Sequence, residues 1–151
     1  MTSEDLARIE KDLSITLTPA YRAALERPEF QSEAAGFQEF SGDADEIIGL
    51  NLDLWEEGFA EVKWQDHHLV IGEDGAGNVY FTDLKKECPA VFLADHEQTA
   101  SKKLLITSEA YETFADFIAF IHRLQAEIAV MPESDESQEA SPAKKSWWRF
   151  W

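Results

Sequence analysis

The chain lacks paired cysteines, long apolar runs and a signal segment. Cys88 is the single cysteine among 151 residues, which excludes an internal disulfide and a zinc site built from several thiolates. No window approaches the ~20 consecutive apolar residues of a membrane span. The first residues, MTSEDLARIEKDLS, contain no apolar signal core. We therefore expect a cytoplasmic protein with no disulfide framework and no stable membrane insertion.

Basic residues are also scarce. The chain has 13 Lys and Arg against 30 Asp and Glu, a formal charge of -17. From Glu133 onward there are four acids and three bases, so the part before it carries -16. Binding to nucleic acid or anionic lipid needs clustered Lys and Arg, and we expect neither as a ligand of this part. The acidity favours a basic protein partner, and the alternative is that it only keeps the protein soluble.

Catalytic and metal-binding patterns are missing as well. EDGAGN, residues 73–78, has neither the oxygen spacing of an EF-hand loop nor the lysine of a phosphate-binding loop, so it predicts a hairpin turn. His67 and His68 are adjacent, and on a strand they would point to opposite faces and could not share one metal. A strand is expected between Cys88 and His96, which argues against a nucleophile and base pair. We expect no catalytic residue, no metal site and no cofactor.

The patterns that are present predict an α+β domain. Apolar residues at helical spacing predict three helices, over residues 3–13, 19–27 and from about 108 to 128. Alternating and β-branched runs predict a hairpin over 69–84 and strands over 90–95 and 104–107. Residues 28–60 satisfy the strand and helix periods in part and stay unassigned. This order predicts one mostly antiparallel central sheet flanked by helices.

Composition divides the chain into three parts. Residues 1–130 are expected to form the domain and residues 131–143 a flexible acidic linker, because MPESDESQEASPA cannot bury enough apolar surface to offset its ordering entropy. Residues 144–151, KKSWWRFW, form an aromatic and basic motif. Trp and Arg are frequent binding hot spots, so docking on a second protein ranks first, contact with a membrane surface second and packing onto the domain third. The binding residues expected there are Trp147, Trp148, Arg149, Phe150 and Trp151.

The order of several short motifs resembles one protein family. ITLTPAYRAAL is followed by Trp64, LVIGEDGAGNVYFTDL, VFLADHE and TFADFIAFI. This succession is similar to the SMI1/KNR4 family of the SUKH superfamily over about residues 5–125, although ERPEFQSEAAGF lacks the Asn-Gly pair often found after the second helix. The resemblance implies an α+β domain with no catalytic residues. It also implies a binding role, because bacterial members are largely immunity proteins that neutralise a cognate toxin, often a nuclease, while a fungal branch takes part in cell-wall signalling.

The residues and the resemblance together favour a non-catalytic protein-binding domain. Our hypothesis is an immunity protein that binds and neutralises a cognate basic toxin domain. Nucleases are among the toxins that this hypothesis includes. The alternative is a housekeeping adaptor of the same fold with a non-toxin partner, and a small-molecule-binding regulator comes third. The acids near the hairpin either form the interface or only decorate a solvated turn. The candidate protein-binding residues of the domain are Trp64, Glu73, Asp74, Asn78 and Asp83.

The aromatic and basic motif can be tested by deletion. Removing residues 144–151 is expected to leave the melting temperature unchanged and to abolish one interaction, because a motif on a polar tether adds nothing to the core. Thermal unfolding of the full and shortened chains measures this. A loss of several degrees would place the motif in the core instead.

Overall fold

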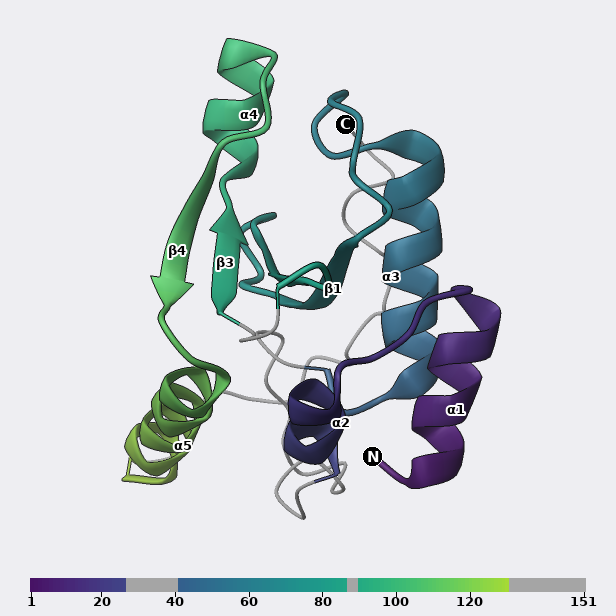
Figure 1. Ribbon diagram of the computed structural model, residues 1–151. Coiled ribbons are helices and arrows are strands. Elements are labelled where there is room, and N and C mark those ends of the chain that lie inside the picture. The colour runs from purple at the N-terminus through teal and green to yellow at the C-terminus, as the bar shows by residue number, and fades with distance from the viewer. Residues whose placement is uncertain (27–40, 87–89, 131–151) are drawn as a thin grey trace, which may run out of the picture.

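The computed structural model describes residues 1–26, 41–86 and 90–130, which form an α+β domain (Figure 1). Four strands form one antiparallel sheet in the order β1-β2-β3-β4. This confirms the predicted fold class. The predicted linker and aromatic motif lie outside the described residues. Within those residues the elements are α1 (Ser3–Asp12), α2 (Pro19–Leu25), α3 (Ala44–Glu57), β1 (His68–Glu73), β2 (Val79–Asp83), β3 (Val91–Ala94), α4 (His96–Lys102), β4 (Thr107–Tyr111) and α5 (Phe114–Val130).

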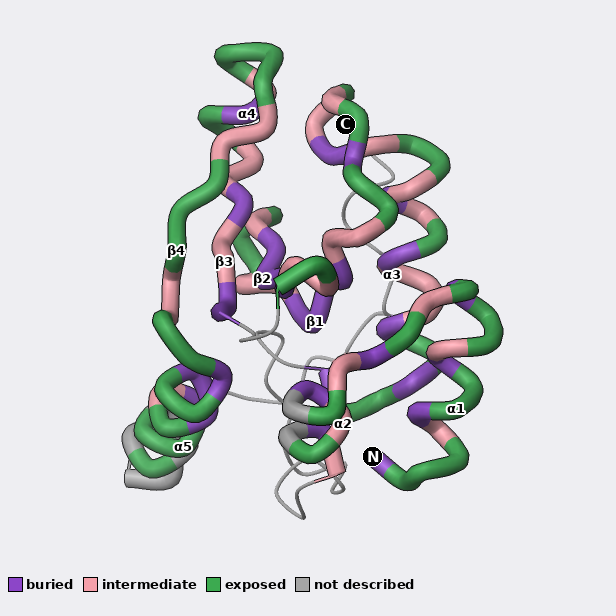
Figure 2. Tube along the Cα trace, in the orientation of Figure 1, coloured by how far each residue is buried: buried purple, intermediate pink, exposed green. Residues whose placement is uncertain are grey.

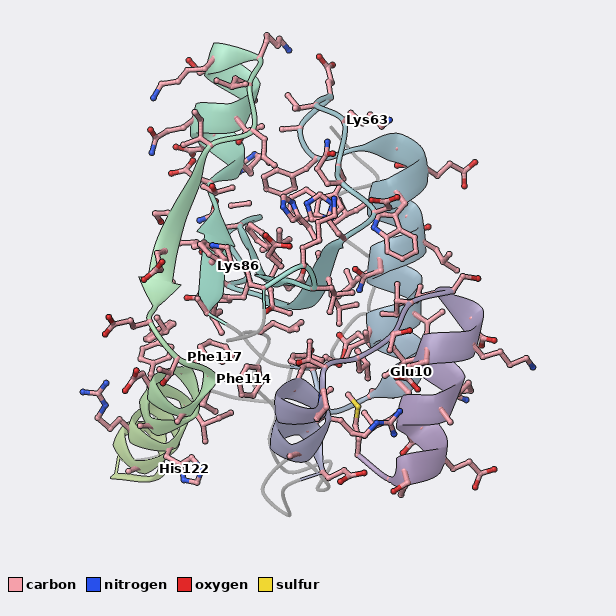
Figure 3. All side chains as sticks on the ribbon, in the orientation of Figure 1. Glu10, Lys63, Lys86, Phe114, Phe117 and His122 are labelled. Carbon is pink, nitrogen blue, oxygen red and sulfur yellow. The ribbon has the colours of Figure 1, made fainter. Side chains whose placement is uncertain are left out.

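The first two helices begin where the sequence predicts them. Thr2 caps α1, since its Oγ1 accepts from the N–H of Asp5 at 3.1 Å and its own N–H donates to the Asp5 carboxylate at 3.0 Å. Glu10 ties α1 to the following segment: its carboxylate accepts from the N–H of Leu17 at 2.9 Å and pairs with the guanidinium of Arg22 on α2 (Figure 3). These contacts join α1 to α2 and to the segment between them.

Two apolar clusters cover the two faces of the sheet. Helices α1, α2 and α5, with the start of α3, pack on the face that carries Leu69 and Ile71. The end of α3 and the segment that leads into β1, including Trp64, pack on the face that carries Val70. Successive residues of β1 therefore enter opposite clusters, as strand geometry requires. Figure 2 shows this burial along β1, β2 and β3, whereas α4 is mostly exposed or half-buried.

Residues 28–60, whose pattern fits neither a strand nor a helix fully, contain helix α3 within their described part. Asp43 precedes this helix and its Oδ1 accepts from the N–H of Asp45 at 2.8 Å, which fixes the start of the helix. Gly58 ends it with a φ of 82°. A Cβ at this glycine would lie 2.5 Å from the carbonyl oxygen of Val62, so the close approach of the two backbones requires glycine.

The helix predicted from about residue 108 starts too early. Ser108 lies in β4, and α5 begins at Phe114. Thr113 provides the real start, because its Oγ1 accepts from the N–H of Asp116 at 3.2 Å. The predicted strand at 104–107 is also shifted: Leu104 is 63% exposed and pairing begins at Thr107. Strand pairing with β3 thus outweighs the helical spacing that the sequence shows over residues 108–111.

Helix α4 has no counterpart in the sequence prediction. It has seven residues, of which Thr99 alone is buried, so it shows no apolar stripe by which periodicity could detect it. Asp95 caps the helix, since its Oδ1 accepts from the N–H of Gln98 at 2.8 Å. The helix lies at one end of the sheet, between β3 and β4 (Figure 1).

Asn51 on α3 forms the main polar contact between a helix and the sheet. Its side chain is fully buried. Its Nδ2 donates to the carbonyl of Val70 at 2.9 Å and its Oδ1 accepts from the N–H of Val70 at 2.8 Å. Nδ2 also donates to the carbonyl of Ile47 at 2.8 Å. Because β1 is at the edge of the sheet formed by the described strands, one amide side chain satisfies both backbone groups of Val70 that face away from β2.

Replacing Asn51 by Ala should lower the free energy of unfolding by about 2–4 kcal/mol, because the N–H and C=O of Val70 would stay buried without partners. Urea unfolding measures the loss. The matched control is Leu52→Ala, one position along the same helix, where the side chain is 45% exposed and a change within about 0.5 kcal/mol is expected. Equal losses in the two variants would show that the amide contacts carry no special weight.

Candidate protein-binding surface at the hairpin tip

The β1–β2 loop is held by the carboxylate of Asp74. Its Oδ1 accepts from the N–H of Ala76 at 2.8 Å and of Asn78 at 3.1 Å, and its Oδ2 accepts from Nδ2 of Asn78 at 2.7 Å. Gly75 and Gly77 adopt φ values of 73° and 90° within the turn, which side chains other than glycine rarely tolerate. The predicted hairpin turn is confirmed, and Asp74 and Asn78 build its shape.

The loop is also anchored to α4. Oδ1 of Asn78 accepts from the N–H of His96 at 2.9 Å. Gly77 packs on the ring of His96 so closely that a Cβ there would lie 3.2 Å from Nδ1. The tip of the hairpin is thus held by the hydrogen bonds of Asp74 within the loop and by the hydrogen bond from His96 of α4 to Asn78. A surface held in this way presents its side chains in one arrangement, and a partner does not have to order it on binding.

The charges of two other carboxylates act on Glu73 beside this loop, and we name Glu46, Glu73 and Asp74 the acidic trio. Glu46 comes from α3, where it is exposed and its carboxylate accepts from Oγ of Ser41 at 2.7 Å. Glu73 ends β1 and is half-buried. Burial, with the charges of Glu46 and Asp74, raises the pKa of Glu73. The ion pairs between described residues include none of the three.

The other candidate residues lie elsewhere. Asp83 pairs in register with His68 at the opposite end of the hairpin, away from Glu73, and its Oδ1 accepts from the N–H of Lys85 at 3.0 Å. Trp64 is 2% exposed; its Nε1 donates to the carbonyl of His68 at 3.0 Å, and it packs inside the domain. The five candidates in 147–151 lie outside the described residues. Of the predicted binding residues that the structure describes, only Glu73, Asp74 and Asn78 therefore lie together.

Glu46 is the member of the trio that the sequence did not indicate. It falls within the unassigned segment, so no argument placed it near the hairpin. The available signal was the cap: Ser41 and Asp43 precede an apolar run with Asp45 and Glu46 in the first helical turn, which is typical of a helix start. This helix start predicts α3, but it does not predict the contact between α3 and β1.

The expectation for His67 and His68 is wrong in its geometry. His67 lies in the turn before β1 and only His68 belongs to the strand, so strand alternation does not separate them. Their ring centroids are 4.5 Å apart. Asp83 lies close to both, and one ligand atom from each of the three side chains lies within 4.8 Å of the others.

The Glu73→Gln variant tests the charge balance of the trio. The raised pKa of Glu73 means that its charged form costs stability as pH rises through that pKa, and that the cost is absent below the ordinary carboxyl pKa of ~4.3. Relative to the native chain, the variant should gain on the order of 0.5 kcal/mol near neutral pH and nothing at about pH 3.5. Urea unfolding at both pH values measures this. A variant less stable at neutral pH would reveal a favourable partner of the carboxylate.

One family of known proteins matches the fold and the motif order of this chain. No described helix combines the length and the apolar content needed to cross a membrane. Neither curated proteins nor solved structures give a match to this chain. The family model described as SMI1 / KNR4 family (SUKH-1) matches residues 1–120, most of the chain. On that match, the chain belongs to the SMI1/KNR4 (SUKH-1) family.

Proposed function

We propose that this domain is an immunity protein of the bacterial cytoplasm that binds and neutralises a basic toxin domain without catalysing a reaction. Membership of SUKH-1, an immunity-protein-like family, supports a non-catalytic binding role. The observation that carries the proposal is the acidic trio: the charges of Glu46 and Asp74 act on Glu73 beside a hydrogen-bonded loop, and the ion pairs between described residues do not include these three carboxylates.

The trio suits a basic partner for a physical reason. Burial and the charges of Glu46 and Asp74 already disfavour the charged form of Glu73, so a Lys or Arg placed beside these carboxylates would relieve a repulsion as well as form new contacts. Opposite charge also speeds the encounter between the proteins. The formal charge of -17 extends this attraction over the whole molecule, while the trio gives it a defined position.

Purification from the native host tests the class of partner. We expect affinity capture of the full chain, followed by mass spectrometry, to return a toxin with a basic domain. Reconstitution of the two purified proteins should then inhibit the toxin in proportion to the chain added. Capture of a housekeeping assembly, with no toxin and no inhibition, would support the adaptor alternative and contradict the proposal.

The position of the interface can be tested with two charge-matched variants once the partner is purified. Glu46→Gln with Glu73→Gln removes two charges from the trio and leaves Asp74 to hold the loop. Glu109→Gln with Glu112→Gln removes two exposed charges on and after β4, at the opposite edge of the sheet. We expect the first variant to slow association about tenfold at low salt and the second to have little effect.

The salt dependence of the association rate provides the second measurement. Exposed charges are screened over about 8–10 Å near physiological ionic strength, so the association rate of the native chain should fall steeply as salt rises. The trio variant should show a shallower dependence. If both charge-matched variants slow association equally, net charge and not the trio steers the partner, and the proposed position is wrong.

A further inference from the structure

Two histidines and an aspartate meet at the open end of the β1–β2 hairpin, at the end away from the acidic trio. Nε2 of His67 lies 4.0 Å from Oδ1 of Asp83. The rings of His67 and His68 have centroids 4.5 Å apart, at an interplanar angle of 63°. All three side chains are partly buried, and one ligand atom of each lies within 4.8 Å of the others. We name this group the imidazole cluster.

The fold holds each member of the cluster in place. His68 and Asp83 are directly paired in the register of β1 and β2, so their side chains stand on the same face of the sheet. The backbone of His67 is fixed because its carbonyl accepts from the N–H of Leu84 at 2.9 Å. Trp64 fixes the next residue, since its indole N–H donates to the carbonyl of His68 at 3.0 Å. The cluster is therefore a consequence of hairpin pairing and not of flexible surface chains.

Surrounding groups orient two of the three side chains. Nδ1 of His67 lies 3.4 Å from Oδ1 of Asp66, which favours a proton on Nδ1 and leaves the lone pair of Nε2 directed to the cluster. A carboxylate behind a histidine is the usual outer partner of a metal-binding imidazole. Asp83 is held in turn by the N–H of Lys85, 3.0 Å from its Oδ1. The ring of His68 packs on Phe81 at 4.7 Å between centroids.

We propose that His67, His68 and Asp83 bind one divalent transition-metal ion of the zinc class, with a further coordination position open to water or to a ligand from another molecule. Two imidazoles and one carboxylate are a donor set that zinc accepts. Zinc bonds of about 2.0–2.2 Å place tetrahedral ligand atoms roughly 3.3 Å apart. The atoms here lie within 4.8 Å, so side-chain rotation alone brings them into range.

An ordinary ion pair between His67 and Asp83 accounts for less of the cluster's arrangement than a bound metal ion does. A contact between protonated His67 and Asp83 would use two of the three side chains at the long separation of 4.0 Å. Nδ1 of His68 would still be buried without a hydrogen-bond partner among the described residues, which costs stability. A metal bound at that nitrogen would remove the cost and link the start of β1 to the end of β2.

Titration of the full chain with Zn²⁺, after treatment with a chelator, tests the proposal. We expect calorimetry to show one ion per chain with a dissociation constant in the micromolar range or tighter, and thermal unfolding to shift upward by several degrees at saturating zinc. His67→Ala and Asp83→Asn should each weaken binding at least tenfold, since even outer partners of a metal contribute that much. Asp83→Asn keeps the side-chain shape and an acceptor for Lys85, so it guards against a fold defect in His67→Ala.

The matched control is His122→Ala, which removes an exposed histidine from α5, outside the cluster. This variant should bind zinc with unchanged affinity and show the same thermal shift as the native chain. Zinc binding that survives in both His67→Ala and Asp83→Asn would come from other residues and would overturn the proposal. So would the absence of micromolar binding by the native chain.

Discussion

The hydrogen bonds between the Asn51 amide and the backbone of Val70 hold α3 against the edge of the sheet, and the rest of the arrangement depends on them. Among the described strands, β1 has a partner on one side only, so its outer backbone groups need other acceptors and donors. Asn51 supplies both for Val70. The N–H of Ser41 then donates to the carbonyl of Ile71 at 2.8 Å, next along the strand. These hydrogen bonds satisfy backbone groups of Val70 and Ile71 on that side of the strand, and those of Asn51 fix the position of α3 along it.

That position decides the chemistry of the hairpin tip. Glu46 lies five positions before Asn51 on α3, and the charges of Glu46 and Glu73 act on each other because the helix is docked at this register. Asp74 contributes a third charge but is also needed for the turn, through its bonds to Ala76 and Asn78. The tip therefore combines a well-satisfied backbone with an unfavourable grouping of charge. Such a grouping is the cost that a binding surface commonly imposes on the stability of its domain.

Sequence reasoning succeeded where the signal was local. The capping box at Thr2 and Asp5 and the turn at Asp74 depend on residues within a few positions of one another. It failed where a longer-range contact decided the outcome. Residues 108–111 have helical spacing, yet they pair with β3. α4 buries one residue and so has no pattern to detect.

The candidate sites were less predictable than the fold, for the same reason. Glu46 and Glu73 are distant in the chain, and only the docking of α3 on β1 brings their charges together. The two histidines were expected to point to opposite faces if they lay on a strand, whereas only His68 belongs to β1 and His67 precedes it. A residue outside a strand does not follow the alternation of faces along the strand, so His67 can lie beside His68, and their ring centroids are 4.5 Å apart.

The two candidate sites lie at opposite ends of the hairpin. His68 pairs with Asp83 at one end and Glu73 with Val79 at the other, and the five steps along β1 from His68 to Glu73 span about 16 Å. This separation is about twice the screening length of about 8 Å at physiological ionic strength. A divalent ion in the imidazole cluster would therefore leave the attraction of the acidic trio for a basic partner almost unchanged. Any effect of the metal on partner binding would have to act through the strands, by fixing the open end of the hairpin whose tip carries the trio.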